Sequence, residues 1–405
     1  MHELIDAAID ALEFGEECIL CTVVRLEGSG YGQPGTRLLL TADGERIGHI
    51  SGGCLERDLC RRVWSATQSG ARLFAFDTRN HADSGAFFDE GRYNTGCEGV
   101  VYVLCQRLTS KEDLFLQVAR DVYQQGQPVT LLTVYRSDSP EINIGDGIAL
   151  GPEGILRTTS PPLVEAFTPH VGLLRAQDQH RTIEWNDGKG NKLEAAIELL
   201  EPPMELVILG AGDDVLSLHA FAQSLGWKVT IIGNRPEHAN AARFPGANVL
   251  CGDWRAMTDA APIHSATHVI LMTHDFAADV DVIPTLLESP AKTIGLMGSK
   301  RRLARLIDAL YAGGRTLSAE EAGRLRSPIG LDIGADRPEE IALSITAELL
   351  ALARERSGGI LHERSRPLHE RRSHQFLRAD ADRAQFPAHA VDNLQYDSFR
   401  CGIET

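Results

Sequence analysis

The segment from Glu205 to Ile232 constrains the fold more than any other part of the sequence. A short apolar run, Glu205–Leu209, leads to Gly210 and Gly212, and a helical pattern and a second apolar run follow. A strand, a glycine turn, a helix and a second strand in this order are typical of the start of a Rossmann fold. The alternation continues through most of the C-terminal half. We therefore expect an α/β fold there, a Rossmann-like doubly wound parallel sheet that has helices on both faces and binds ligands at the carboxyl ends of its strands.

The glycine fingerprint of a dinucleotide site is incomplete in this segment. Val215 occupies the third glycine position, and Asp213 and Asp214 bring negative charge to the place where a pyrophosphate would lie. Gly233 stands where an acidic residue would hold a ribose. Carboxylates at this position can instead cap the helix. The pattern therefore indicates the fold more strongly than it indicates an NAD site.

Four residues nevertheless keep NAD(P) binding open. Gly210 and Gly212 lack a side chain that would hold a phosphate away. Asn234 and Arg235, just after the second strand, could meet a ribose hydroxyl or a phosphate, as arginine does in sites that accept a 2′-phosphate.

His274 follows the apolar strand His268–Met272, at the edge where such sheets bind ligands. It could be the acid or base of an NAD(P)-dependent oxidoreductase, which is the alternative function that the sequence allows. It could equally donate a structural hydrogen bond to Asp275 or to a loop carbonyl.

A glycine turn in the N-terminal half carries a cysteine. Apolar runs at Arg37–Thr41 and Ile47–Ile50 predict a hairpin, and Gly52 and Gly53 follow, where backbone amides can closely approach a bound group. Cys54 then begins the next predicted helix, a position that favours the thiolate. The other interpretation is a tight turn that carries a small buried cysteine.

Three further cysteines need an interpretation. Cys97 lies between glycines before another apolar run, so it could face the same pocket as Cys54 or be a core cysteine in an ordinary turn. Cys18 and Cys21 have CxxC spacing, but they open an apolar run in which residues three apart face opposite sides of a strand. We expect them to pack in a core and not to bind zinc.

Pro202 and Pro203 mark the expected boundary between two domains, since 405 residues exceed what one core usually supports. We predict a mixed α+β domain over residues 1–200, the Rossmann-like domain over 204–361, and a largely disordered tail over 362–405. The net charge of −16 argues against a general nucleic-acid binder. Dispersed cysteines, an acidic amphipathic N-terminus and no apolar run near the ~20 residues of a membrane span favour a cytoplasmic protein.

Several stretches, taken together and in order, resemble the XdhC/CoxI family of maturation factors for molybdenum hydroxylases. They are GQPGTRLLL, SGGCLERD, GCEGVVYVL, LVILGAG, VTIIGNRPEHANAARFP, HVILMTHDFAAD, IGLMGSKRR and SPIGLDIGADRPEEIALSITAEL. The resemblance implies an accessory protein that binds molybdenum cofactor (molybdopterin), protects it during sulfuration by a cysteine desulfurase, and delivers it to a xanthine-dehydrogenase-type apoenzyme. It also leads us to expect a homodimer. A purely structural adaptor is a third option.

The resemblance also implies where the cofactor binds. In SGGCLE, Cys54 becomes the candidate ligand of the molybdenum, and Gly52, Gly53 and Glu56 become candidate cofactor contacts; in GCEG, Cys97 becomes a second. The Rossmann-like candidates are Gly210, Gly212, Asn234, Arg235 and His274. This chain has Asp213 and Gly233 where family members often carry His and Asp, so its C-terminal domain could serve as a docking surface or as a site for the pterin phosphate.

Overall fold

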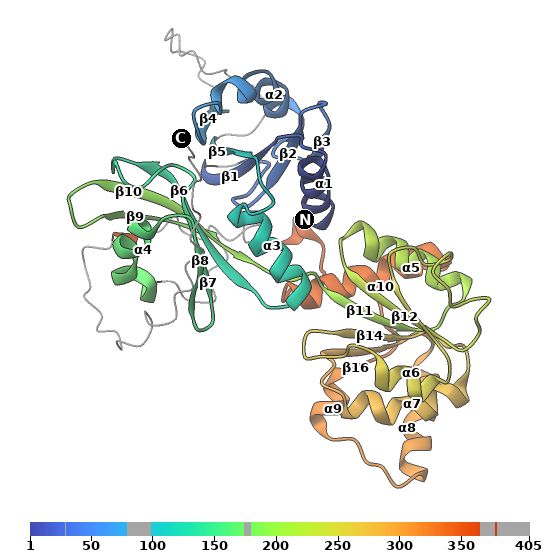
Figure 1. Ribbon diagram of the computed structural model, residues 1–405. Coiled ribbons are helices and arrows are strands. Elements are labelled where there is room, and N and C mark those ends of the chain that lie inside the picture. The colour runs from blue at the N-terminus through green and yellow to red at the C-terminus, as the bar shows by residue number, and fades with distance from the viewer. Residues whose placement is uncertain (29, 79–98, 174–179, 365–376, 379–405) are drawn as a thin grey trace. The chain divides into compact units, whose positions relative to one another are not determined.

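The computed structural model describes residues 1–28, 30–78, 99–173, 180–364 and 377–378 (Figure 1). The chain forms two compact units. The first spans Met1–Pro202 and takes in the short strand β17 (Leu377–Arg378), and the second spans Pro203–Leu368. Within the described residues, no helix has both the length and the apolar character needed to cross a membrane.

The first unit begins with a five-stranded antiparallel sheet, sheet A, in the order β3-β2-β1-β5-β4. Its strands are β1 (Cys18–Gly28), β2 (Arg37–Thr41), β3 (Arg46–Gly48), β4 (Arg72–Asp77) and β5 (Gly99–Leu108). The helices α1 (His2–Glu13) and α3 (Leu114–Gln125) pack on one face, and α2 (Cys54–Ala66) packs on the other. Leu4, Ile5 and Ala8 are the buried residues of α1, on the face that the helical period predicts.

Cys18 and Cys21 face opposite sides of sheet A, as their spacing predicts. Cys18 lies in the core beside α1, and Cys21 lies in the core beneath α2; both are fully buried. Burial raises the pKa of the Cys18 thiol to about 11 and also raises the pKa of the Cys21 thiol. Cys21 lies directly opposite Cys105 of β5, with 3.4 Å between the two sulfur atoms. These cysteines are core side chains.

A six-stranded sheet, sheet B, completes the first unit in the order β17-β9-β10-β6-β7-β8. All its pairs are antiparallel except that of β17 with β9. The other strands are β6 (Val129–Ser137), β7 (Gly147–Gly151), β8 (Gly154–Thr158), β9 (His180–Asn186) and β10 (Lys192–Leu200). The helix α4 (Pro161–Phe167), which continues into the 3-10 turn η1 (Thr168–Leu173), packs on sheet B through Leu163, Val164 and Phe167.

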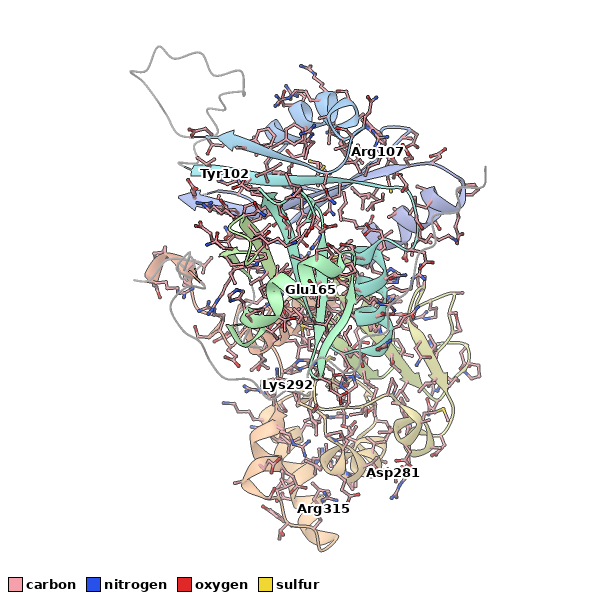
Figure 2. The ribbon with its side chains drawn as sticks, turned by 60° about the vertical axis from the view of Figure 1, so that its left-hand side comes forward. Tyr102, Arg107, Glu165, Asp281, Lys292 and Arg315 are labelled. Carbon is pink, nitrogen blue, oxygen red and sulfur yellow. The ribbon has the colours of Figure 1, made fainter. Side chains whose placement is uncertain are left out.

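Charged and aromatic side chains link the two sheets of the first unit. The guanidinium groups of Arg25 on β1 and Arg136 on β6 lie 5.2 and 5.7 Å from the ring centre of Tyr102 on β5, which is labelled in Figure 2. Arg37 of β2 forms a buried ion pair with Glu198 of β10. Sheets A and B are therefore joined by polar as well as apolar contacts.

The second unit is the expected Rossmann fold, a six-stranded parallel sheet in the order β13-β12-β11-β14-β15-β16. Numbered from the first strand of the unit, this is the order 3-2-1-4-5-6 of dinucleotide-binding folds. Its strands are β11 (Glu205–Leu209), β12 (Lys228–Gly233), β13 (Asn248–Cys251), β14 (His268–Leu271), β15 (Thr293–Leu296) and β16 (Leu325–Arg326).

Helices cover both faces of this sheet, as predicted (Figure 1). The helices α5 (Asp213–Ser224) and α10 (Pro338–Ala353) pack on one face. The helices α7 (Phe276–Glu288) and α8 (Lys300–Ala312) pack on the other, together with the shorter α6 (Trp254–Ala260). The apolar residues of α5 and α10 meet those of β11 and β12 in a single core, which fixes the N-termini of both helices near the end of β11.

Short elements depart from the sequence prediction. The helix α9 (Ala319–Arg324), the strand β16 and the 3-10 turn η2 (Leu361–Glu363) carry little apolar periodicity and were not expected. Within the predicted tail over 362–405, Leu377–Arg378 form β17, and apart from residues 362–364 the remainder lies outside the described residues.

Candidate functional site

The predicted hairpin of β2 and β3 is present, with Leu39 opposite Ile47. Its second strand ends at Gly48 and does not reach Ile50, which corrects the expected Ile47–Ile50 strand. Gly48 has φ +82°, and a Cβ there would lie 2.5 Å from the carbonyl oxygen of Arg37. The chain leaves the sheet after Gly48, and the side chain of Ile50, at the start of the turn that follows, is fully buried.

That turn ends at the N-terminus of α2. Gly53 is the N-cap and has φ +107°, a conformation that disfavours other residues. Gly52 and Gly53 are exposed, and a Cβ at either would meet nothing within 4 Å. Cys54 is the first residue of α2. The backbone of the turn is therefore open to approach at the residues that precede the cysteine.

The carboxylate of Glu56 holds the turn together from inside. It accepts hydrogen bonds from the amides of Ile50 (2.9 Å), Ser51 (2.6 Å) and Gly53 (3.0 Å), and from the Ser51 hydroxyl. The Ser51 hydroxyl oxygen in turn accepts the amide of Leu55 at 3.2 Å. Because Gly53 has no side chain, Ser51 supplies the cap that an N-cap residue normally provides.

These hydrogen bonds favour the ionised form of Glu56, which is a buried residue. Burial alone would raise the pKa of its carboxyl, but the hydrogen bonds from Ser51 and from the backbone amides lower the pKa below its ordinary value. Glu56, which we expected to contact a cofactor, is placed where it shapes the backbone that would do so.

A second segment adjoins the turn and carries residues that the sequence did not single out. A Cβ at Gly32 would lie only 2.3 Å from the carbonyl oxygen of Ile50, so the chain packs tightly there. Tyr31, 64% exposed, lies with its ring centre 5.9 Å from that of the exposed His49. No local sequence pattern predicts the contact between Tyr31 and His49, because the two residues lie far apart in the chain.

Cys97, the second cysteine expected at this site, lies outside the described residues. Its proximity to Cys54 stays a prediction.

The Rossmann candidates meet at the carboxyl edge of the second unit. Gly210 has φ +142°, and a Cβ there would lie 2.3 Å from the carbonyl oxygen of Met272, so β11 and β14 approach closely. Gly212 is the N-cap of α5. His274, at φ +54°, places Nε2 2.8 Å from Oδ2 of Asp214. Its partner is therefore neither Asp275 nor a loop carbonyl, and Gly210, Gly212 and His274 are brought together.

Asn234 and Arg235 are exposed beyond the end of β12. Next to them, Gly233 leaves no room for the acid of a ribose site, because a Cβ there would lie 2.7 Å from Cβ of Ala239 and 3.1 Å from Cβ of Ala211. The absence of an acid, noted from the sequence, thus has a steric basis.

Asp213, in the first turn of α5, pairs with Arg243 at 2.7 Å. This hydrogen bond and the charge of Arg243 lower the pKa of the Asp213 carboxyl. The expectation that these two carboxylates could cap the helix is wrong, because α5 has no side-chain cap hydrogen bond. Each carboxylate is instead paired with a side chain, Asp213 with Arg243 and Asp214 with His274.

A cavity of about 450 Å³ opens at this edge. Met272, Met297 and Ile341 supply apolar surface, and Asp214, His274 and Asp336 supply polar groups. It lies where the strand order reverses, between β11 and β14, which is the usual ligand position in such sheets.

Two family models match the chain. The XdhC Rossmann domain matches residues 206–349, and the XdhC and CoxI family matches residues 11–77. The chain belongs to the XdhC and CoxI family. In this XdhC and CoxI chain, the glycine turn before Cys54 falls within the match to residues 11–77, and the cavity falls within the match to residues 206–349. Cys97 falls outside both.

Similar proteins cover most of this XdhC and CoxI chain. A protein of Bacillus subtilis, named as a probable subunit of xanthine dehydrogenase, is 28% identical over 352 residues, 86% of this chain and 96% of its own. "Molybdenum cofactor insertion chaperone PaoD" from Escherichia coli is 22% identical, over 85% of this chain and 86% of its own. The crystal structure of a xanthine dehydrogenase from Bacillus halodurans matches with a TM-score of 0.64 and 25% identity, over 87% of this chain and 96% of its own.

Proposed function

We propose that this protein is a maturation factor for a molybdenum hydroxylase, which binds molybdenum cofactor and inserts it into the enzyme. The observation that carries the proposal is the turn at residues 51–54. There a cysteine begins a helix after two glycines whose surroundings are open. The similarity to an insertion chaperone over 85% of the chain supports the same function.

The chemistry of the turn suits this cargo. Molybdenum held by dithiolene sulfurs is a soft centre, for which a thiolate is a fitting ligand. A helix N-terminus favours the thiolate form of a cysteine. We assign the metal contact to Cys54 and the close backbone approach to Gly52 and Gly53. Glu56 is the positioning residue, because its carboxylate binds the amides that shape the turn.

The proposal includes the steps around binding. We propose that the protein shields the cofactor while a cysteine desulfurase sulfurates it, releases it to the apoenzyme, and works as a homodimer. Cys97 is the second proposed cofactor contact. Of the Rossmann candidates, Gly210, Gly212 and His274 line one edge of the sheet, whereas Asn234 and Arg235 are exposed at the end of β12.

The test is cofactor loading of Cys54→Ser. Purified from a molybdenum-replete host, this variant should carry roughly tenfold less molybdenum and pterin than the wild type, because it lacks the soft ligand. Metal analysis and fluorescence of the oxidised pterin are the two measurements. Cys251→Ser is the matched control, since Cys251 is an exposed cysteine of the second unit. Equal loading of wild type and Cys54→Ser would overturn the assignment.

An NAD(P)-dependent oxidoreductase is the second candidate function. The pairing of His274 with Asp214 favours it, because a carboxylate that orients a histidine is common in acid–base catalysis. The closed position at Gly233 and the carboxylates at the start of α5 oppose it. Calorimetry with reduced nicotinamide cofactors decides between the two, and saturable binding would favour the oxidoreductase.

A further inference from the structure

The cavity at the carboxyl edge of the second unit has the size of a small-molecule site. Its volume of about 450 Å³ lies in the lower half of the range of roughly 300–1,000 Å³ that is usual for ligand pockets. Its walls come from residues that follow β11, β14 and β15, from the first turn of α5 and from the start of α10. In the strand order of this sheet, that is the half away from β12 and β13.

The apolar part of the lining suits a flat ring. Met272 and Met297 come from the ends of neighbouring parallel strands, and Ile341 comes from α10. Methionine side chains are flexible and polarizable, so they adapt to a ring and make favourable contacts with it. This part of the cavity therefore offers stacking surface without fixing one ring chemistry.

The polar part of the lining accepts hydrogen bonds and repels anions. It includes the carboxylates of Asp213, Asp214 and Asp336 together with His274, and, among the described residues, neither lysine nor arginine lines the cavity. Carboxylates bind hydroxyl and amino groups, whereas a phosphate beside them is repelled in this partly enclosed space. The lining thus favours a ligand with hydroxyl and amino donors and no phosphate.

The other half of the dinucleotide position is closed. A Cβ at Gly233 would meet Ala239 at 2.7 Å, so the acid that normally binds the adenosine ribose cannot be accommodated without a shift. The carboxylate of Asp213, which also lines the cavity and pairs with Arg243, stands at the start of α5, where a pyrophosphate would meet helix amides. Only one of the two halves of a dinucleotide site is available.

We propose that this cavity binds a nucleoside, with its base on Met272, Met297 and Ile341 and its hydroxyl or amino groups on Asp214 and Asp336. The cavity belongs to the second unit and the turn before Cys54 to the first, and the inference does not rest on the proposed function. It assigns to the Rossmann unit a ligand that is smaller and less charged than NAD(P).

Isothermal titration calorimetry on the full chain tests the inference with adenosine, guanosine and cytidine, each compared with its 5′-monophosphate, and with NAD. At least one nucleoside should bind, and its monophosphate and NAD should bind at least roughly tenfold more weakly, because each adds charge that the carboxylates repel. Ile341→Trp should abolish binding by filling the cavity. Asp336→Asn should weaken binding several-fold, while Asp332→Asn, an exposed neighbour outside the lining, should not.

Three results would overturn the inference. The first is that none of the three nucleosides binds at 1 mM. The second is that NAD or a monophosphate binds as tightly as the nucleoside. The third is that the Ile341→Trp variant still binds the nucleoside while its melting temperature is unchanged. Molybdenum loading measured on the same samples keeps the two proposals apart, since a failure at this cavity leaves the loading by Cys54 untouched.

Discussion

Single side chains decide the shape of the turn before α2, and Glu56 has the largest part. Its carboxylate accepts three backbone amides and the Ser51 hydroxyl in a buried position. Glu56→Gln keeps the size of the side chain but turns amide hydrogens toward backbone donors. We expect a loss of about 1–2 kcal/mol in the free energy of unfolding, as for a lost helix cap, and reduced molybdenum loading.

Urea denaturation at pH 7 measures this loss. Glu45→Gln is the matched control. Glu45 is exposed on the same hairpin, and it uses only its backbone in the hydrogen bonds of the connection between β2 and β3. The wild type should also lose its advantage over Glu56→Gln as the pH falls below about 4.5, since the folded carboxyl has the lower pKa. A variant as stable and as well loaded as the wild type would show that the carboxylate does not position the turn.

At the scale of the elements, the turn before α2 depends on the segment at Tyr31 and Gly32. A Cβ at Gly32 would lie 2.3 Å from the carbonyl oxygen of Ile50, and both are backbone-bound groups that cannot rotate away. Gly32→Ala should therefore lower the melting temperature, with a cost of roughly 1–3 kcal/mol for the forced shift. Gly52→Ala, where a Cβ would meet open space, should stay within about 0.5 kcal/mol. Thermal unfolding of both variants is the measurement, and equal stability would contradict the close contact.

The same elements show which features of the fold can be predicted from the sequence and which cannot. The βαβ start of the second unit was predictable from local signals, because apolar runs, glycines and helical periodicity all lie within Glu205–Ile232. The contact of Gly32 with Ile50 was not, since it joins distant residues. The apolar Ile50 predicts a strand that extends to residue 50. β3 ends at Gly48, however, and the buried Ile50 belongs to the turn that follows. Likewise, the sequence indicates Asp275 or a loop carbonyl as the partner of His274, whereas the partner is Asp214 of α5.

At the scale of the whole molecule, stability in mild acid should be limited by a histidine in the core of the second unit. His268, at the start of β14, is 2% exposed, and burial together with the nearby charge of Lys292 lowers its pKa to about 4 (Lys292 is labelled in Figure 2). An unfolded histidine titrates near pH 6.5. The unfolded chain therefore takes up this proton first as the pH falls, and the free energy of unfolding decreases between about pH 6.5 and pH 4.

The size of the effect follows from the two pKa values. Between pH 7 and pH 5 this single group should reduce the stability by about 2 kcal/mol. Calorimetry of the wild type and of His268→Leu over this interval measures it: the wild-type melting temperature should fall with the pH, and the fall should be smaller in the variant. Carboxylates paired in the folded state lose their contribution mainly below this interval, so the difference between the two proteins isolates His268. Parallel curves for both would mean that His268 takes up its proton without unfolding the unit.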